Sequence, residues 1–332
     1  MRCAAAVPEH GGPDALGVPL HDFSTNGNAV GPCPGALRAV QEVDAVRYPD
    51  PLYSELRARL AAFHGVPAGR IVLAASASEF IFRVTAAAAR TGARTVRLPD
   101  HSFGDYRKAV QAWGLSIATG EACAALHWCC DPSSPLGQAQ PDLAAVVDAL
   151  AAGTTCVFDL AYEPLRLEGA LGLTAAQRER VWQLWTPNKA LGLTGVRAAY
   201  AVAPAGAQAR VDLLESLAPS WPVGAHGVAL LQSWTTAETH RWLAASRDTL
   251  RAWKARLAAL CDAMGWQRCA SAANFFCARP HGRDVQALCA ALRTQGIKLR
   301  DTSSFGLPGH VRLSVLPPDS QDALRAAVAT LP

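Results

Sequence analysis

The stretch that decides the fold is Val181-Trp-Gln-Leu-Trp185 followed directly by Thr186-Pro-Asn-Lys189-Ala-Leu-Gly-Leu-Thr-Gly195-Val-Arg197. Its first part is a short, mainly apolar run of the length expected for a buried strand. Lysine is usually a solvated surface residue. Here Lys189 follows an apolar run, with a glycine six residues later and an arginine eight residues later. The stretch therefore predicts a strand that leads into a loop carrying a lysine suited to chemistry.

Short apolar runs and longer helix-like stretches alternate around this stretch. The runs that predict strands are residues 71–74, 95–98, 124–130, 155–159, 181–185 and 196–203. Residues 79–89 and 143–151 carry apolar side chains at helical spacing. Such alternation is typical of a mostly parallel sheet covered by helices. We therefore expect an α/β fold.

A second, smaller unit follows the segment Ala218-Pro-Ser-Trp-Pro-Val-Gly224, which is punctuated twice by proline. After it come a long helical stretch from 225 to about 264, a strand at 274–278, a helix at 284–295, a strand at 311–315 and a final helix. These features predict a large domain at residues 36–224 and a small α+β domain at 225–332.

Composition limits the classes of function. Half of the 332 residues are hydrophobic and 17% are charged, so the chain can bury a large core and is not a disordered polymer. The formal charge of +4 comes from 31 Lys and Arg against 27 Asp and Glu. This dispersed excess predicts no nucleic-acid or membrane-surface partner. Because no apolar run approaches the roughly 20 residues of a membrane span, we expect a cytoplasmic protein.

The ten cysteines are scattered, and Cys129 and Cys130 are adjacent within an apolar run. This arrangement is typical of reduced core thiols, not of a disulfide framework or a zinc site. The nine histidines also lack the paired spacing of a zinc-binding helix. We therefore expect no metal.

Two further segments point to a site. Ser76 and Glu79 follow the apolar run 71–74 at the spacing of a capping box, and a helix start of this kind offers free N–H groups to an anion. An ordinary capped helix has the same pattern. Asp159 ends another apolar run, at the edge of the sheet where ligands of open α/β folds bind. It could equally cap the next segment.

The Lys189 stretch, with Asp159 and the capped helix start upstream, resembles the Schiff-base lysine signature of the class I/II aminotransferases, a family of fold-type I pyridoxal 5′-phosphate enzymes. The resemblance implies a seven-stranded, mostly parallel sheet in the large domain and a small α+β domain. His10-Gly11-Gly12, Asp22-Phe-Ser-Thr-Asn26-Gly-Asn28-Ala-Val-Gly31-Pro32 and Arg47-Tyr48-Pro49-Asp50 resemble segments of the histidinol-phosphate aminotransferase and threonine-phosphate decarboxylase branch. The first 35 residues would then join the small domain to the substrate site.

The resemblance assigns cofactor roles one position at a time. Lys189 would form the Schiff base and carry a proton, Asp159 would pair with the pyridine nitrogen, and Tyr162 would hydrogen-bond the ring oxygen. Phe103 would stack on the cofactor ring. The remaining predicted contacts are with the cofactor phosphate: the N–H groups of Ala77 and Ser78, the side chains of Thr186 and Arg197, and Tyr48 of a partner chain.

At residues 131–137 the chain departs from the family pattern. The sequence is Asp131-Pro-Ser133-Ser134-Pro135-Leu-Gly137, where the family usually reads Asn-Pro-x-Gly. Ser134 therefore stands where an asparagine normally hydrogen-bonds the ring oxygen. A serine hydroxyl is shorter and could reach that oxygen only through a water or a shifted loop.

Two carboxyl-terminal segments resemble the same branch, namely Ile297-Lys-Leu-Arg300-Asp301-Thr-Ser303-Ser304-Phe305-Gly and His310-Val-Arg312-Leu-Ser-Val. The resemblance implies that Arg312 binds the substrate carboxylate, a role that suits a planar guanidinium. His10, Asn28 and Arg300 would contact the rest of a small phosphorylated amino acid substrate.

The resemblance implies a lyase that decarboxylates L-threonine O-3-phosphate to (R)-1-amino-2-propanol phosphate for cobalamin biosynthesis, and it implies a homodimer with shared active sites. An aminotransferase of the histidinol-phosphate type is the alternative, since almost every cofactor residue would be the same. A non-catalytic relative of the fold is a third, which only Ser134 favours. One sequence does not show which bond stands perpendicular to the cofactor ring, and that orientation decides between decarboxylation and transamination.

Overall fold

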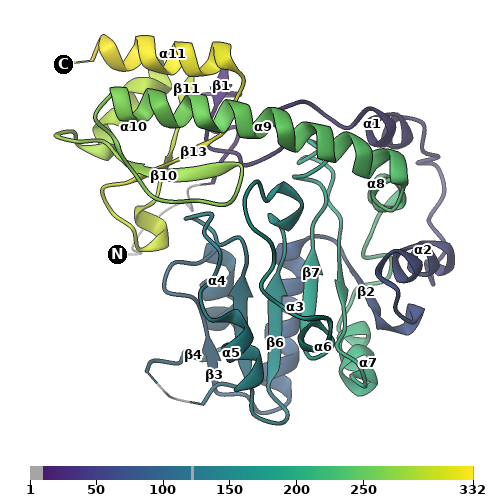
Figure 1. Ribbon diagram of the computed structural model, residues 1–332. Coiled ribbons are helices and arrows are strands. Elements are labelled where there is room, and N and C mark those ends of the chain that lie inside the picture. The colour runs from purple at the N-terminus through teal and green to yellow at the C-terminus, as the bar shows by residue number, and fades with distance from the viewer. Residues whose placement is uncertain (1–9, 121–122, 332) are drawn as a thin grey trace, which may run out of the picture.

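A seven-stranded sheet forms the centre of the larger lobe (Figure 1). The computed structural model describes residues 10–120 and 123–331. In spatial order the strands are β2 (Ile71–Ala74), β8 (Ala199–Val202), β7 (Trp182–Trp185), β6 (Thr155–Asp159), β5 (Leu126–Cys130), β3 (Thr95–Arg97) and β4 (Ser116–Ile117).

The sheet is mostly parallel, as the sequence predicts. Every neighbouring pair from β7 to β4 is parallel, and only β8 runs against its two neighbours. Strands β2, β6 and β8 are almost fully buried, so they consist of nearly continuous apolar runs. The sequence does not predict β4, because two residues are too short for a detectable pattern.

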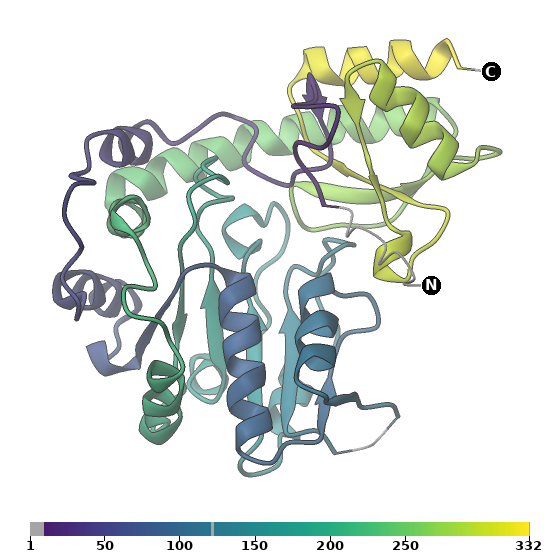
Figure 2. The ribbon, with the colours of Figure 1, turned by 180° about the vertical axis from the view of Figure 1, so that it is seen from behind.

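Helices cover both faces of this sheet, and residues that alternate along each strand face different layers. On one face, seen from behind in Figure 2, lie α3 (Ala77–Arg90), α4 (Gly104–Ala112) and α7 (Gln208–Ser216). On the other lie α5 (Leu143–Asp148) and α6 (Ala175–Arg178). Val157 of β6 packs with the first group, whereas Phe158 packs with α5.

The smaller lobe contains a four-stranded antiparallel sheet of β12 (Arg300–Asp301), β13 (Val311–Ser314), β10 (Phe275–Arg279) and β9 (Gln267–Arg268). Two helices, α10 (Val285–Thr294) and α11 (Pro318–Ala329), belong to the same lobe. The amino-terminal strand β1 (His21–Asp22) pairs in parallel with β11 (Ile297–Lys298). Residues 21–22 of the amino-terminal segment therefore lie against the smaller lobe (Figure 1).

The helical stretch expected from 225 to 264 is two helices, α8 (Ala225–Trp234) and α9 (Ala237–Ala263). The break falls where Thr236 caps the second helix, since its Oγ1 accepts the N–H of Thr239 at 3.3 Å. In Figure 1 the long helix α9 runs from the side of α8, above the large sheet, to the smaller lobe, where it lies below α11. The other helices, α1 (Pro34–Gln41) and α2 (Ser54–His64), lie beside α8.

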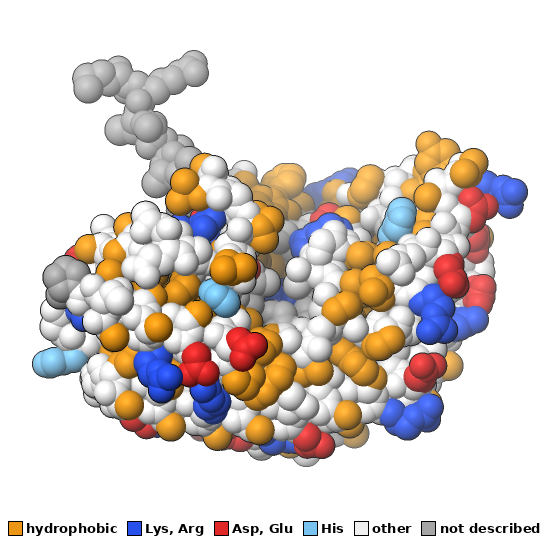
Figure 3. All heavy atoms as spheres, turned by 90° about the horizontal axis from the view of Figure 1, so that it is seen from above, with side chains coloured by type: hydrophobic (Ala, Val, Ile, Leu, Met, Phe, Trp, Pro, Cys, Tyr) orange, Lys and Arg blue, Asp and Glu red, His pale blue; other side chains and the backbone are white. Residues whose placement is uncertain are grey.

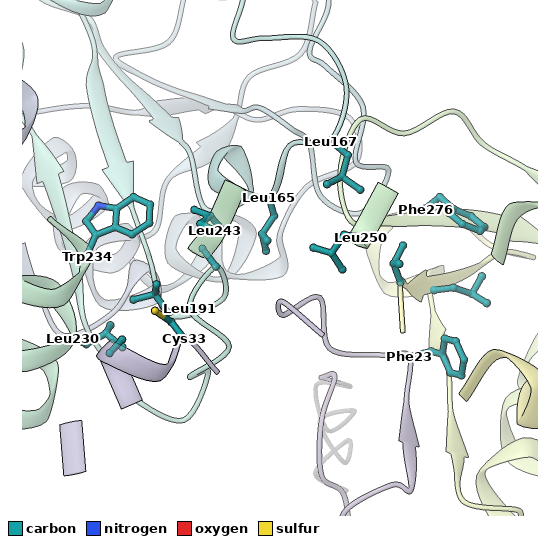
Figure 4. Close-up of a cluster of buried hydrophobic side chains, with 14 of the residues drawn as sticks. Phe23, Cys33, Leu165, Leu167, Leu191, Leu230, Trp234, Leu243, Leu250 and Phe276 are labelled. Carbon is teal, nitrogen blue, oxygen red and sulfur yellow. The ribbon is translucent and has the colours of Figure 1, made fainter. Parts of the chain in front are cut away.

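A continuous hydrophobic cluster joins the lobes (Figure 4). Leu243 and Leu250 of α9 lie in it between Trp234 of α8 and Phe23 and Phe276 on the side of the smaller lobe. Truncation of a buried leucine to alanine costs about 2–5 kcal/mol. The cluster therefore holds the lobes at one separation, which fixes the width of the space between them.

Charges of both signs are interspersed on the face seen from above, which is hollowed near its middle (Figure 3). Within residues 10–120 and 123–331, no helix combines the length and apolar character that a membrane span requires.

Candidate active site

A cavity of about 870 Å³ lies between the lobes, at the carboxyl ends of β5, β6 and β7. It brings together twelve of the residues singled out from the sequence: His10, Ala77, Ser78, Phe103, Ser134, Asp159, Tyr162, Thr186, Lys189, Arg197, Arg300 and Arg312. These residues form two walls. The cofactor wall belongs to the large lobe and consists of Ala77, Ser78, Phe103, Ser134, Asp159, Tyr162, Thr186, Lys189 and Arg197. The substrate wall consists of His10, Ser24, Asn26, Arg300 and Arg312.

Asp159 ends β6 and is buried. The hydroxyl of Tyr106 donates to its Oδ2 at 2.7 Å, and the N–H of Ala161 donates to its Oδ1 at 3.0 Å. Burial raises the pKa of the Asp159 carboxyl, while the Tyr106 hydrogen bond and the charge of Lys189 oppose that rise. A buried carboxylate of this kind favours a cationic partner in the cavity.

Lys189 lies on the loop after β7, with its Nζ 5.4 Å from the centre of the Tyr162 ring. The loop is closed by Asn188, whose Nδ2 donates to the carbonyls of Thr194 and Val196, both at 3.3 Å. Gly192 has a φ of +67°, and a Cβ there would lie 2.7 Å from the carbonyl oxygen of Gly31. Only glycine fits this close approach, which explains Gly192 but not Gly195, whose surroundings leave room for a side chain.

One end of the cofactor wall is suited to an anion. Ala77 and Ser78 occupy the first turn of α3, where N–H groups are not used by the helix itself. Ser76 caps this helix by accepting the N–H of Glu79 at 3.1 Å, and Glu79 accepts the N–H of Ala75 at 3.2 Å. Thr186 adds a buried hydroxyl that has no hydrogen-bond partner among the described residues. With the nearby Arg197, these groups can hold a phosphate.

The space beside Lys189 is suited to a flat ring. Phe103, at the start of α4, and Tyr162, after β6, both line the cavity. Ser134 is buried and lines it too, on the loop after β5. The set therefore offers an aromatic face, a phenol and a short hydroxyl around a planar ligand, with Asp159 in the same cavity.

The substrate wall contains two arginines directly opposite each other, since Arg300 of β12 pairs in register with Arg312 of β13. Both guanidinium groups lie over the ring of Phe305, at 4.8 Å and 5.5 Å from its centre. Arg312 donates from Nη2 to the carbonyl of Ser24 at 2.9 Å, but its buried Nε has no hydrogen-bond partner among the described residues. An arginine with an unused buried donor suits an anionic substrate group.

The cavity as a whole is cationic. Six lysine and arginine side chains line it against three aspartates. Such an excess favours ligands that carry more than one negative charge, and a phosphorylated compound meets this condition.

Two predicted residues lie outside this cavity. Asn28 was expected to bind substrate, but its Nδ2 donates to Ala190 and its Oδ1 accepts the N–H of Val30. These two bonds give Asn28 a role in holding the backbone, and Asn26 lines the cavity in its place. Tyr48 is 79% exposed and stacks on Trp221 at 4.5 Å, so it does not reach the site of its own chain.

Sequence reasoning missed Asn26 and Tyr106. Asn26 is buried, its Nδ2 lies 3.4 Å from the Tyr162 hydroxyl, and its Oδ1 has no hydrogen-bond partner among the described residues. Its signal was its place in the amino-terminal segment that carries Asn28. Tyr106 follows Phe103 by one helical turn, and this spacing was its signal.

Comparison with known proteins agrees with this geometry. The family model "Aminotransferase class I and II" matches residues 19–331. A curated relative, histidinol-phosphate aminotransferase 2 of Burkholderia mallei, is 28% identical over 96% of this chain and 93% of its own length.

Two solved structures share the fold. Histidinol-phosphate aminotransferase from Sinorhizobium meliloti, in complex with pyridoxal 5′-phosphate, has a TM-score of 0.80 and 21% identity, and the match covers 97% of this chain and 94% of that one. L-threonine-O-3-phosphate decarboxylase from Porphyromonas gingivalis has a TM-score of 0.78 and 21% identity, with 93% and 98% covered. The chain belongs to the class I and II aminotransferase family and is a pyridoxal 5′-phosphate-dependent enzyme of fold type I.

Proposed function

We propose that the enzyme transfers an amino group from a phosphorylated amino compound of the histidinol-phosphate type to a keto acid. The observation that carries this proposal is the cationic substrate wall, where Arg300 and Arg312 lie in the same cavity as Lys189. The name of the Burkholderia mallei relative supports the phosphorylated donor.

The residues present fit the cofactor, because the buried Thr186 hydroxyl lacks a partner and lies in the same cavity as the open helix start of α3. When bound, pyridoxal 5′-phosphate supplies a ring that stabilises negative charge on the carbon bearing the amino group. We expect Asp159 to hold the proton on the pyridine nitrogen and Tyr162 to donate to the ring oxygen. Lys189 Nζ would attach the cofactor and then move the proton on the substrate carbon.

The substrate wall orients the reacting compound. Arg312 and Arg300 would hold its phosphate, and their register on neighbouring strands fixes the position of that group relative to Lys189. The cluster around Leu243 and Leu250 packs residues of both lobes together beside the cavity and so stabilises the placement of the two walls.

Decarboxylation of L-threonine O-3-phosphate, the reaction the sequence favours, is the second candidate, and the comparisons support transamination better. The observation in favour of decarboxylation is the position of His10-Gly11-Gly12 at the cavity. His10 and Gly11 line it, and a Cβ on Gly11 would lie 2.3 Å from the Ser24 carbonyl oxygen. The glycine therefore lets the segment approach closely enough to present His10.

Product analysis tests the two reactions side by side. The cofactor-loaded enzyme is incubated with histidinol phosphate and 2-oxoglutarate, and glutamate is measured. A parallel sample receives L-threonine O-3-phosphate, and carbon dioxide is measured. Glutamate formation that disappears in Lys189→Ala supports the proposal, whereas carbon dioxide release without glutamate formation replaces it by the second candidate.

We further propose a homodimer in which Tyr48 reaches the cofactor phosphate of the other subunit. Tyr48, Val46 and Leu52 are all more than 70% exposed on one chain and form an apolar surface next to Trp221. Mixing Lys189→Ala with Tyr48→Ala chains checks this arrangement. In a shared-site dimer the mixed species has one intact site and recovers activity, whereas sites made by a single chain recover none.

A further inference from the structure

The hydroxyl of Tyr106 donates a hydrogen bond to the Asp159 carboxylate, and the cofactor chemistry above does not use this contact. We propose that Tyr106 is a positioning residue, whose hydroxyl fixes the Asp159 carboxylate in the orientation that meets the pyridine nitrogen. The inference rests on the assignment of Asp159 to that nitrogen, and it holds for transamination and decarboxylation alike.

The Tyr106 ring is held on two sides. It is fully buried in the first turns of α4, with its face stacked on Trp128 of β5 at 4.5 Å and an angle of 16°. Phe103 meets it edge-on at 6.0 Å and 87°. Its backbone N–H donates to the Phe103 carbonyl at 3.1 Å. One residue therefore connects the ring expected over the cofactor with the carboxylate expected at its nitrogen.

A count of donors shows what this contact does for the carboxylate. Asp159 Oδ2 accepts from Tyr106 at 2.7 Å, and Oδ1 accepts from the Ala161 N–H at 3.0 Å. A carboxylate oxygen can accept two hydrogen bonds, so each oxygen keeps one site for a ligand. Without the Tyr106 hydroxyl only one of these bonds remains, and the terminal torsion of aspartate is broad and poorly fixed by itself.

The pKa shifts of Asp159 and Tyr106 also support a positioning role for Tyr106. Burial raises the pKa of Asp159, and the hydrogen bond from Tyr106 is the largest of the contacts that lower it, ahead of Lys189 and Ala161. In return, burial and the neighbouring carboxylate raise the pKa of Tyr106 far above its ordinary value, so it stays a donor. The Cys130 thiol is also kept neutral by burial and donates to the Pro132 carbonyl. Tyr106 therefore helps Asp159 to keep the negative charge that a protonated pyridine requires.

The experiment compares Tyr106→Phe with Tyr200→Phe, a matched loss of one buried hydroxyl. Tyr200 is equally buried but bonds to Trp234 and His64, away from Asp159. The dissociation constant of pyridoxal 5′-phosphate is measured for both variants and for wild type, each also in an Asp159→Asn background. Thermal unfolding without cofactor reports whether each variant is folded.

The expected result is that Tyr106→Phe weakens cofactor binding roughly tenfold, a typical effect for a hydrogen bond to a charged group. Tyr200→Phe changes it less than about twofold. In the Asp159→Asn background the effect of Tyr106→Phe becomes much smaller, because the amide oxygen can still accept the hydroxyl but carries no negative charge. Since loss of the hydroxyl raises the pKa of Asp159, binding to Tyr106→Phe also weakens at a higher pH than binding to wild type as the solution is acidified.

Equal effects of Tyr106→Phe with and without Asp159 overturn the proposal, and so does an unchanged pH profile. If Asp159→Asn binds too weakly to measure, the pH profile decides alone. These measurements concern cofactor binding only. A failed search for transamination or decarboxylation leaves them valid, so the two hypotheses fail separately.

Discussion

The two walls of the cavity differ in how the chain builds them. The residues of the cofactor wall lie at the ends of neighbouring strands or at a helix start, each within a few residues of a regular element. The substrate wall is assembled from two regions far apart in the sequence, the amino-terminal segment with His10 and Asn26 and the neighbouring strands with Arg300 and Arg312.

This difference shows how the chain divides its tasks. Strand ends in a packed sheet are rigid, which suits a cofactor that must stay in one position. The substrate wall depends on contacts between segments far apart in the sequence. Examples are Asn274 Nδ2, which donates to the Gly27 carbonyl at 2.9 Å, and the Ser314 N–H, which donates to the Phe23 carbonyl at 2.8 Å. We therefore expect changes in the cofactor wall to reduce turnover and changes in the substrate wall to raise KM.

Loss of the lysine has the largest expected effect. Lys189→Ala removes the group that attaches the cofactor and moves the proton, so turnover falls on the order of 10⁴-fold or more. Because the side chain is only half buried and its backbone contacts remain, the melting temperature changes little. Steady-state rates and thermal unfolding check both points. Retention of more than a few per cent of activity would contradict the role of Lys189.

Arg312→Ala tests the substrate wall, as Lys189→Ala tests the cofactor wall. It removes a bidentate donor for an anion, and we expect KM for the phosphorylated substrate to rise by about 10–100-fold, with unchanged affinity for the cofactor. Arg312→Lys keeps the charge without the planar fork and recovers only part of the loss. Cofactor titration and substrate saturation curves separate these effects. A weaker cofactor affinity in either variant would show that the walls are not independent.

Substitution of the two asparagines of the amino-terminal segment has smaller expected effects, on KM for Asn26 and on stability for Asn28. Asn26 lines the cavity, so Asn26→Ala raises KM several-fold with little loss of stability. Asn28→Ala removes one buried and one partly buried hydrogen bond and lowers the free energy of unfolding by about 1–3 kcal/mol. Denaturant unfolding and kinetics are measured on both variants. If instead Asn28→Ala raises KM and Asn26→Ala mainly lowers the free energy of unfolding, Asn28 is the residue that contacts the substrate.

Substitution of Asp14 has the smallest expected effect, a change in stability that depends on pH. Hydrogen bonds from Arg293 and Lys298 hold the pKa of its carboxyl well below the usual range. A depressed pKa stabilises the fold above the unfolded value of about 3.9, and this stabilisation is lost as the pH falls below it.

Thermal unfolding of Asp14→Asn and wild type tests the ion pairs of Asp14 with Arg293 and Lys298. We expect a small, constant difference in melting temperature above about pH 5 that narrows as the solution is acidified below about pH 4. A difference that widens in acid would show that the ion pairs with Arg293 and Lys298 do not carry the effect.

Much of the large lobe could be predicted from the sequence because its signals are local. Strands β2 and β6 match their predicted bounds, and the helix start at Ser76 is read directly from its capping pattern. The break between α8 and α9 was missed, because no glycine or proline interrupts the stretch there and only a threonine cap marks it.

The substrate wall was harder to predict, since side-chain direction there depends on tertiary contacts. Nothing in the amino-terminal segment itself distinguishes Asn26 from Asn28. The choice is made by Lys189, whose carbonyl accepts the Asn28 N–H at 2.8 Å and turns that residue away from the cavity. The contact of Tyr106 with Asp159 joins residues 53 positions apart, so no local pattern reveals it.

The most direct test of the division between the walls is one cross-comparison of two variants, Asp159→Asn and Arg312→Ala. Each is titrated with pyridoxal 5′-phosphate and then saturated with the phosphorylated substrate. We predict that Asp159→Asn weakens cofactor binding and slows turnover, while Arg312→Ala binds cofactor like wild type and shows only a raised KM. If Arg312→Ala loses cofactor affinity as strongly as Asp159→Asn, the cavity is a single cooperative site and the division is wrong.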